Sequence, residues 1–183
     1  LAEVVEEGLQ IDYNQEHPRV QQQIARFESD NITIFSHLDE EGVIMLKYIL
    51  AELNRRGMPA ELAFIPLVES SYRPDASNRG HHVGLWQLGG PTARVFGVEV
   101  GQQIDGRYNI KASTDAALTY LEYLNKMFDG DWLLTMAAYN AGEGRVLGSI
   151  KRNQQADKKA DYWSLSLPNV TQEYIPKVLA LSQ

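Results

Sequence analysis

Hydrophobic residues recur every three or four positions over most of this chain, which is the spacing of helices with one buried face. The clearest case predicts a helix over residues 37–56, followed by Gly57, and glycine commonly follows a helix C-terminus. Its apolar positions are Val43, Leu46, Leu50 and Leu53. No series of alternating apolar and polar residues is present, so the pattern favours a mainly α fold.

Two segments depart from this spacing. Residues 60–70 are apolar on nearly every face, which predicts a helix buried on all sides. Residues 75–90 are rich in Gly, Asn, Arg and His, which predicts a loop or a short β-hairpin. Further helices are predicted at 18–29, 91–96, from Ser113 or Thr114 as N-cap to near 128, 131–140, 143–151, and from Thr171 onward, where Pro176 should kink or shorten the last helix.

Length and composition fit one compact domain with room for a small appendage. The chain has 183 residues and is 44% hydrophobic, enough to bury a substantial core. Residues 1–17 are polar and acidic, so we expect them to form a loosely held arm. We divide the chain into an N-terminal arm and helical extension over 1–57 and a main domain over 58–183.

Charge and cysteine content exclude several classes of protein. The formal net charge is −7, whereas nucleic-acid binding needs a basic surface that releases counterions. No apolar run approaches the roughly 18 residues that span a bilayer, so we expect no membrane contact by this stretch. Cysteine is absent, which excludes disulfides and thiolate metal sites. We expect a monomer.

Glu69 is the most informative single residue. It lies at the end of the apolar 60–70 segment, and no Lys or Arg lies within one helical turn of it. Burial and the negative end of the helix dipole should both raise its pKa, because each disfavours the carboxylate. A carboxyl that stays protonated near neutral pH can serve as a general acid. The alternative is an ordinary, half-exposed glutamate at a helix end.

Other segments carry chemistry that is ambiguous when each is taken alone. Gly84-Leu85-Trp86-Gln87 could bring backbone close to a ligand, stack Trp86 on a sugar and hydrogen-bond through Gln87, or could be a glycine-rich turn with a core tryptophan. Tyr139 and Asn140 end an alanine-rich helix, and could be polar groups of a site or a buried tyrosine and a helix cap. Tyr174 could equally be a core aromatic.

A metal site is not expected. His81 and His82 are adjacent, and neighbouring residues rarely chelate one ion. No HExxH pattern accompanies them.

Taken in order, these segments resemble the family 1 lytic transglycosylases, over about residues 18–183. Four ordered motifs around one glutamate make the resemblance specific. They are Glu69-Ser70-Ser71-Tyr72, Gly84-Leu85-Trp86-Gln87, Ala138-Tyr139-Asn140-Ala141-Gly142 and Tyr174. The resemblance implies a lysozyme-like helical domain of the goose-type and soluble lytic transglycosylase kind, with a small loop or β-hairpin region, so that 58–183 becomes the catalytic domain.

The resemblance also implies the site. Glu69 matches the catalytic acid, and we assign substrate binding to a set that follows or surrounds it. That set is Ser70, Trp86, Gln87, Tyr139, Asn140 and Tyr174. The partner implied is the glycan strand of peptidoglycan, and no cofactor is expected. The implied location is the envelope of a Gram-negative bacterium, facing the periplasm, with the parent protein anchored in the outer membrane.

The reaction implied is an internal transfer that leaves a 1,6-anhydromuramic end. Ordinary glycosidases use a pair of carboxyl groups. No second acidic residue lies in the motifs, and Asp75 and Asp105 are candidates only by default. A single acid and base suffices if the substrate's own C6 hydroxyl attacks. The alternatives are a goose-type lysozyme that uses water and a peptidoglycan-binding domain without catalysis.

Overall fold

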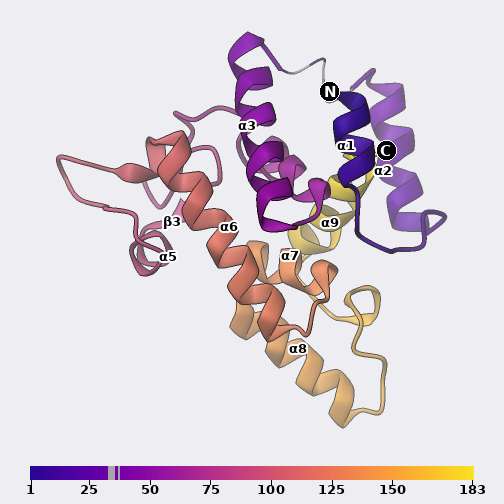
Figure 1. The fold of residues 1–183 in the computed structure, drawn as a ribbon. Coiled ribbons are helices and arrows are strands. Elements are labelled where there is room, and N and C mark those ends of the chain that lie inside the picture. The colour runs from indigo at the N-terminus through magenta and orange to yellow at the C-terminus, as the bar shows by residue number, and fades with distance from the viewer. Residues whose placement is uncertain (33–35, 37) are drawn as a thin grey trace.

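The computed structural model describes residues 1–32, 36 and 38–183, and its architecture is mainly α with one small sheet. The predicted fold class is confirmed in this respect. In Figure 1 the long helix α6 (Ile110–Met127) runs diagonally, with β3 and α5 near one end and α7 and α8 toward the other.

The first half of the described chain is built mostly of helices. They are α1 (Ala2–Gly8), α2 (Pro18–Ser29), α3 (Glu40–Arg56), the 3-10 helix η2 (Ala60–Phe64) and α4 (Ile65–Ser70). α3 ends as predicted, with Gly57 in the left-handed conformation at φ 67°. Its predicted start at His37 lies outside the described residues; the described helix begins at Glu40, capped by the side chain of Asp39.

The predicted hairpin is a three-stranded antiparallel sheet of very short strands. The strands are β1 (Ser77–Asn78), β2 (His82–Val83) and β3 (Leu88–Gly89), in the order β1-β2-β3. The short helix α5 (Gly90–Val95) follows β3 directly, and it packs on α6.

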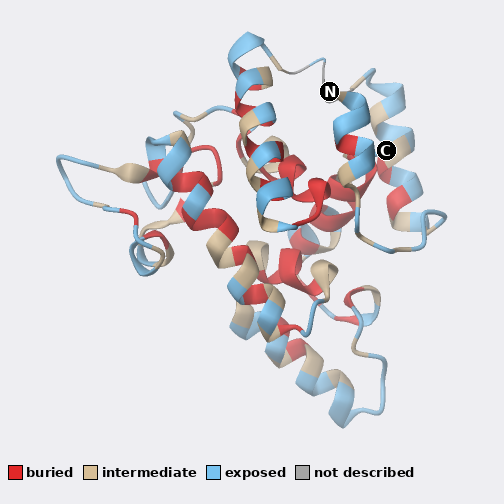
Figure 2. Ribbon diagram, in the orientation of Figure 1, coloured by how far each residue is buried: buried red, intermediate tan, exposed pale blue. Residues whose placement is uncertain are grey.

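The second half contains the helices that surround the core. After η3 (Gly106–Tyr108) and α6 come α7 (Trp132–Ala141), α8 (Glu143–Gln155), η4 (Tyr162–Ser164) and α9 (Asn169–Leu181). α7 packs against α6, α8 and α9, so it lies at the centre of the helical layer. Its buried small residues, Ala137 and Ala138, permit this close packing. Figure 2 shows the buried positions gathered where these helices meet η2 and α4.

The predicted cap of α6 is wrong. Asn109 is the N-cap, and its Oδ1 accepts a hydrogen bond from the Ala112 backbone N–H at 2.8 Å. Ser113 and Thr114 are the fourth and fifth residues of the helix and are buried, and Thr114 accepts a bond from Trp86. The helix therefore starts one turn earlier than predicted, at Ile110.

The buried 60–70 segment is not one helix. It changes from 3-10 to α geometry at Ile65, and Pro66 follows in the first turn of α4. Proline has no N–H to continue the earlier hydrogen-bond series, so the chain begins a new helix there. The predicted burial holds for 60–66, where every residue is buried.

Pro176 does not interrupt α9, which runs through it from Asn169 to Leu181. Proline cannot donate to the carbonyl four residues earlier, that of Gln172. The hydroxyl of Tyr162 donates to this carbonyl at 3.2 Å and to that of Thr171 at 2.8 Å. The buried tyrosine thus satisfies backbone that the proline leaves unbonded.

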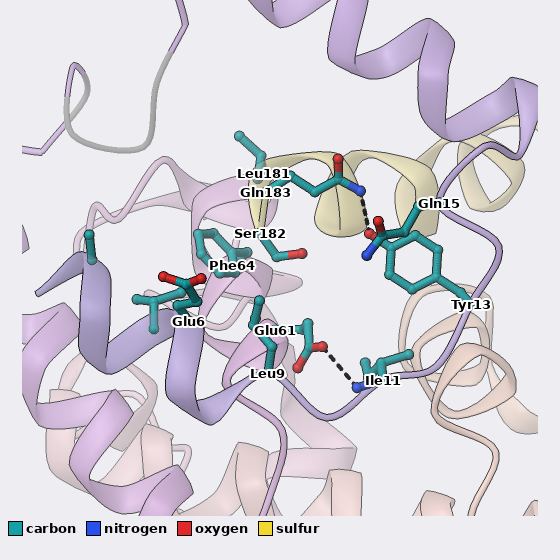
Figure 3. A pocket seen from close by; sticks show the side chains of 12 residues that line it. Glu6, Leu9, Ile11, Tyr13, Gln15, Glu61, Phe64, Leu181, Ser182 and Gln183 are labelled. Carbon is teal, nitrogen blue, oxygen red and sulfur yellow. Dashed lines mark hydrogen bonds between the residues drawn. The ribbon is translucent and has the colours of Figure 1, made fainter.

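The N-terminal segment is held more firmly than a loose arm. The buried carboxylate of Glu61 accepts backbone N–H bonds from Gln10 at 3.1 Å and Ile11 at 2.9 Å. At its other side, Gln183 donates to the Tyr13 hydroxyl at 2.6 Å. Figure 3 shows the Ile11–Glu61 and Gln183–Tyr13 bonds on either side of a cavity of about 480 Å³ between the N-terminal segment and the end of α9. The division at residue 57 stays a prediction.

Candidate active site

Glu69 is the penultimate residue of α4, directly before a tight turn. Ser71 and Tyr72 both have positive φ, 53° and 57°, an uncommon conformation for residues with a side chain. The turn is held by the Tyr72 hydroxyl, which donates to the Ala63 carbonyl at 2.6 Å in the core. Strained backbone held by surrounding structure is frequent at functional sites. The turn fixes the direction in which the end of α4 points, and therefore the direction of Glu69.

Ser70 ties α4 to the Gly84–Gln87 segment. Its Oγ lies 3.0 Å from the Pro66 carbonyl and 2.7 Å from that of Leu85. Ser70 is itself buried, so its hydroxyl faces protein rather than an open site. The expectation that Ser70 binds substrate is therefore replaced by a positioning role. Ser70 sets the distance between the end of α4, which carries Glu69, and the Gly84–Gln87 segment.

The pKa of the Glu69 carboxyl is raised, as the sequence predicted. Burial raises its pKa to about 7, and a hydrogen bond from Tyr174 acts in the opposite direction. The Tyr174 hydroxyl donates to Glu69 Oε1 at 2.8 Å. Tyr174 is buried, and its own pKa is raised well above 10 by burial, so it remains a donor at neutral pH. Glu69 is accordingly present in both protonation states near pH 7.

Glu69 opens into a groove of about 660 Å³ between the sheet, α5, α6 and α7. The groove brings together Glu69, Gln87, Tyr139 and Asn140 from three separate motifs. Its other lining residues come from the sheet, α5, α6 and the end of α7: Asn78, His82, Leu88, Gly89, Thr92, Tyr120, Ala141 and Gly142. The arrangement is an open, polar groove with one carboxyl of raised pKa.

Gln87 faces the groove from a strained backbone position, with φ 50°. Its side-chain nitrogen donates to the carbonyls of Gly84 at 2.8 Å and Ala76 at 3.2 Å. These bonds use the donors of the amide, so the oxygen remains for a ligand that donates. Gln87 can therefore form the hydrogen bond predicted from the sequence as an acceptor from a ligand.

Gly84, the first residue of the Gly84–Gln87 motif, allows two segments of backbone to pack closely together. Gly84 has φ 84°, and a Cβ placed on it would lie 2.0 Å from the carbonyl oxygen of Arg107. The close approach predicted for a ligand is instead made by the protein's own η3 segment.

Trp86 does not offer a ring face to a sugar. Its side chain is fully buried, and Nε1 donates to Thr114 Oγ1 at 3.0 Å. The stacking prediction is wrong because the motif turns Trp86 inward and Gln87 outward. Trp86 supports the site through its backbone: its carbonyl accepts a 2.6 Å bond from the Tyr139 hydroxyl.

Tyr139 and Asn140 come from the last turn of α7, which Asp131 begins as predicted. Asn140 Oδ1 accepts a bond from Thr171 Oγ1 at 2.8 Å, which joins α7 to α9. Its amide nitrogen is therefore the group that remains for a ligand. Burial, followed by the nearby Glu69 charge, raises the pKa of Tyr139 well above 10.

Arg107 was not predicted, yet it holds the wall of the groove opposite α7. Its buried guanidinium donates to the carbonyls of His81 at 2.9 Å and Leu88 at 3.1 Å, and to Asp105 Oδ2 at 2.8 Å. One side chain thus ties β2, β3 and η3 together. Asp105, considered as a second acid, is committed to this ion pair, and the hydrogen bond from Arg107 lowers its pKa.

Lining residues of the groove from the sheet and from α5 were also missed. Asn78, His82 and Thr92 lie in segments whose sequence indicated only a polar loop and a short helix. His82 was considered only as a metal ligand beside His81, and nothing in the sequence set Asn78 or Thr92 apart from their neighbours. Among the described residues, no group of three or more His, Asp or Glu side chains is placed to hold a metal ion.

Comparison with known proteins agrees with this geometry. The model of the transglycosylase SLT domain matches residues 48–162, more than half of the chain. The chain belongs to the transglycosylase SLT domain family. The match contains Glu69, the sheet, α6 and α7, and ends before α9, so Tyr174 lies outside it. The mainly α, lysozyme-like fold predicted from the motifs is confirmed by the family and the structure together.

Two relatives of this SLT domain illustrate its range. Membrane-bound lytic murein transglycosylase D of Escherichia coli K12 is 48% identical over 135 residues, which are 74% of this chain and 30% of that protein. Peptidoglycan transglycosylase gp16 of Escherichia phage T7 is 36% identical over 99 residues, 54% of this chain and 7% of that protein. The chain therefore spans less than a third of the length of either relative.

Proposed function

We propose that the chain is a peptidoglycan lytic transglycosylase domain in which Glu69 is the single acid and base. The observation that carries the proposal is a carboxyl with pKa about 7, open to a groove and hydrogen-bonded to one tyrosine. A general acid works best when its pKa is near the working pH. The names of the two relatives, a murein and a peptidoglycan transglycosylase, support the choice of substrate.

The proposed reaction begins with protonated Glu69. It donates its proton to the oxygen between N-acetylmuramic acid and N-acetylglucosamine, and the bond from muramic C1 to that oxygen breaks. The substrate's 2-acetamido group stabilises the positive charge at C1. Glu69, now a carboxylate, takes the proton of the muramic C6 hydroxyl as its oxygen bonds to C1. The result is a 1,6-anhydromuramic end and a regenerated acid, with no water consumed.

The groove residues have distinct roles in this proposal. The free amide nitrogen of Asn140 donates to a carbonyl such as that of the acetamido group, and the free oxygen of Gln87 accepts from a sugar hydroxyl or amide. Tyr174 holds Glu69 in one rotamer and stabilises its carboxylate in the second half of the reaction. Tyr139, bonded to the Trp86 carbonyl, fixes the spacing between α7 and the Gly84–Gln87 segment.

Product analysis tests the proposal. Purified sacculi are digested with the wild-type chain, and the soluble fragments are analysed by mass spectrometry. We expect anhydromuramic ends, lighter by one water than the reducing ends that a goose-type lysozyme releases. Reducing ends would overturn the proposed reaction in favour of hydrolysis. Binding to sacculi without solubilisation would instead indicate a peptidoglycan-binding domain.

Glu69→Gln assigns the catalytic group. General acid catalysis contributes about 10²–10⁴ in rate, so we expect turnover to fall by at least this factor while binding to sacculi persists. Glu99→Gln, an exposed glutamate outside the groove lining, is the matched control and should keep wild-type turnover. Retained turnover in Glu69→Gln contradicts the assignment.

We further infer that the parent protein works in the cell envelope of a Gram-negative bacterium, because its substrate lies there and an E. coli relative is named membrane-bound. Any anchor in the outer membrane belongs to the same inference. Within the described part of the chain, no helix is both long enough and apolar enough to cross a membrane.

A further inference from the structure

An aromatic cluster continues from the groove along α6. Tyr120 lines the groove, and its ring lies 5.6 Å from that of Tyr139. On its other side, Phe96 lies 5.2 Å from Tyr120 and 5.8 Å from Tyr123. Tyr120 and Tyr123 are themselves 6.5 Å apart, with their planes 19° from parallel. The cluster therefore leads step by step from the Glu69 side of the groove to the surface.

Tyr123 is the exposed end of this cluster. Its side chain is 47% exposed, although its ring contacts two other aromatic rings. Tyr120 and Tyr123 are three residues apart on α6, so they share one face of the helix. Their rings are nearly parallel, and Tyr123 carries the exposed part of this aromatic pair. Flat aromatic surfaces of this kind suit the apolar face of a pyranose ring.

Glu143 is a charged residue near enough to Tyr120 to affect its hydroxyl. It is the first residue of α8, after Gly142 of the groove, and its charge helps raise the pKa of Tyr120 to about 12 after the larger effect of burial. Its Oε2 is buried, and no group in the described part of the chain donates a hydrogen bond to it. An unpaired buried carboxylate oxygen is costly, and a ligand that donates to it would recover that cost.

We propose that Tyr120, Tyr123 and Glu143 form a saccharide subsite next to the catalytic groove. The aromatic rings support a sugar ring adjacent to the bond that is cut, and Glu143 accepts hydrogen bonds from the hydroxyl or amide groups of that sugar. The identity of the saccharide, a peptidoglycan glycan strand, rests on the proposed function. The subsite adds length to the strand that the chain can hold, beyond the sugars in contact with Glu69.

The test measures binding apart from catalysis. Tyr123→Ala and Glu143→Gln are each made in the Glu69→Gln chain, and their affinities for short and long peptide-free glycan strands are compared by calorimetry. Loss of stacking should weaken binding of long strands about two- to tenfold, and loss of the carboxylate about tenfold. Short strands that fill only the groove at Glu69 should bind as before.

Each variant has a matched control. Tyr108→Ala removes a tyrosine that is 45% exposed and absent from the groove lining. Glu40→Gln removes an exposed glutamate at the same first position of a helix, here α3, so it reproduces any change in interaction with the helix dipole. Both should bind long strands as the Glu69→Gln chain does.

The outcomes separate this proposal from the proposed function. Equal affinity of Tyr123→Ala and its Glu69→Gln parent for long strands overturns the subsite, even if the wild-type chain makes anhydro ends. An equal loss for short and long strands also overturns it, because the effect would then not be confined to a neighbouring sugar. If the wild-type chain cuts nothing but Tyr123→Ala still weakens long-strand binding, the subsite stands and the catalytic proposal fails.

Discussion

The Tyr174 hydroxyl acts on Glu69 in the direction opposite to burial. Its hydrogen bond favours the carboxylate and lowers a pKa that burial has raised to about 7. Tyr174→Phe removes this bond and should raise the Glu69 pKa further. Since the acid form starts the reaction, activity falls as pH rises through that pKa, and the alkaline limb should move up by about one pH unit. The measurement is kcat against pH on soluble glycan strands.

Tyr162→Phe is the control for that experiment. Tyr162 is another buried tyrosine whose hydroxyl donates to α9, but to backbone carbonyls rather than to Glu69. Its removal should lower stability and leave the alkaline limb in place. An unmoved limb in Tyr174→Phe would show that this tyrosine only packs beside the acid.

At the scale of single residues, the sequence predicted a property that depends on one side chain and its neighbours in the chain. Glu69 was predicted as a raised-pKa acid because an apolar helix leads to it, and this holds. Ser70 and Trp86 were assigned to substrate, but both face inward. A motif identifies residues near a site, whereas the direction of each depends on turns such as that at Ser71 and Tyr72, which have no glycine to mark them.

The turn from β2 into β3 carries Gln87 of the groove. Gly84→Ala would place a Cβ against the Arg107 carbonyl, in a backbone conformation at φ 84° that also disfavours side chains. Overpacking and the left-handed conformation together should cost about 2–5 kcal/mol. We expect a lower free energy of unfolding in urea and loss of turnover, because Gln87 and the Leu85 carbonyl that Ser70 contacts move with this turn.

Gly130→Ala separates the two causes. Gly130 has φ 88°, but a Cβ placed on it would meet nothing within 4 Å. This control should lose only the conformational part, about 1–2 kcal/mol, and keep its turnover. Equal losses of stability in both variants would mean that the Arg107 contact at Gly84 contributes nothing.

At the scale of elements, the sequence predicted a helix boundary where a single residue marks it. Gly57 at the end of α3 and Asp131 at the start of α7 act as predicted, because each carries its own signal at the boundary. The start of α6 was misplaced because its true cap, Asn109, directly follows the 3-10 helix η3, and the cap predicted at Ser113 or Thr114 lies one turn further along. The continuity of α9 through Pro176 was unpredictable locally, since it depends on Tyr162 from a different segment.

At the scale of the whole molecule, the site is assembled by contacts between distant segments. Tyr174 and Glu69 are 105 residues apart, and Arg107 reaches back 26 residues to His81. The order of the motifs predicted that they meet. It did not predict the groove wall of Asn78 and His82, or the aromatic surface at Tyr123, because no motif contains them. Those positions become visible only when α6, α5 and the sheet are placed together.

The raised pKa of Glu69 should also make the stability of the whole chain depend on pH. The folded-state pKa is about 7 and the ordinary value is 4.5, so the folded state holds the proton more tightly than the unfolded state. The stability that this group contributes is complete below about pH 4.5 and is lost as pH rises to about 7. Above that window the folded chain carries a poorly solvated carboxylate.

Glu69→Gln should therefore raise the stability of the folded chain at high pH, although it removes catalysis. Glutamine is neutral, and its oxygen can still accept the Tyr174 hydroxyl, so packing is kept while the titration is removed. We expect the variant's Tm to exceed that of the wild type at about pH 8 and to equal it at about pH 4, measured by calorimetry with Glu99→Gln as the exposed control. A Tm difference that is the same at both pH values would mean that burial does not penalise the carboxylate. The gain in stability at high pH would measure how much the buried Glu69 carboxylate destabilises the fold of the wild-type chain.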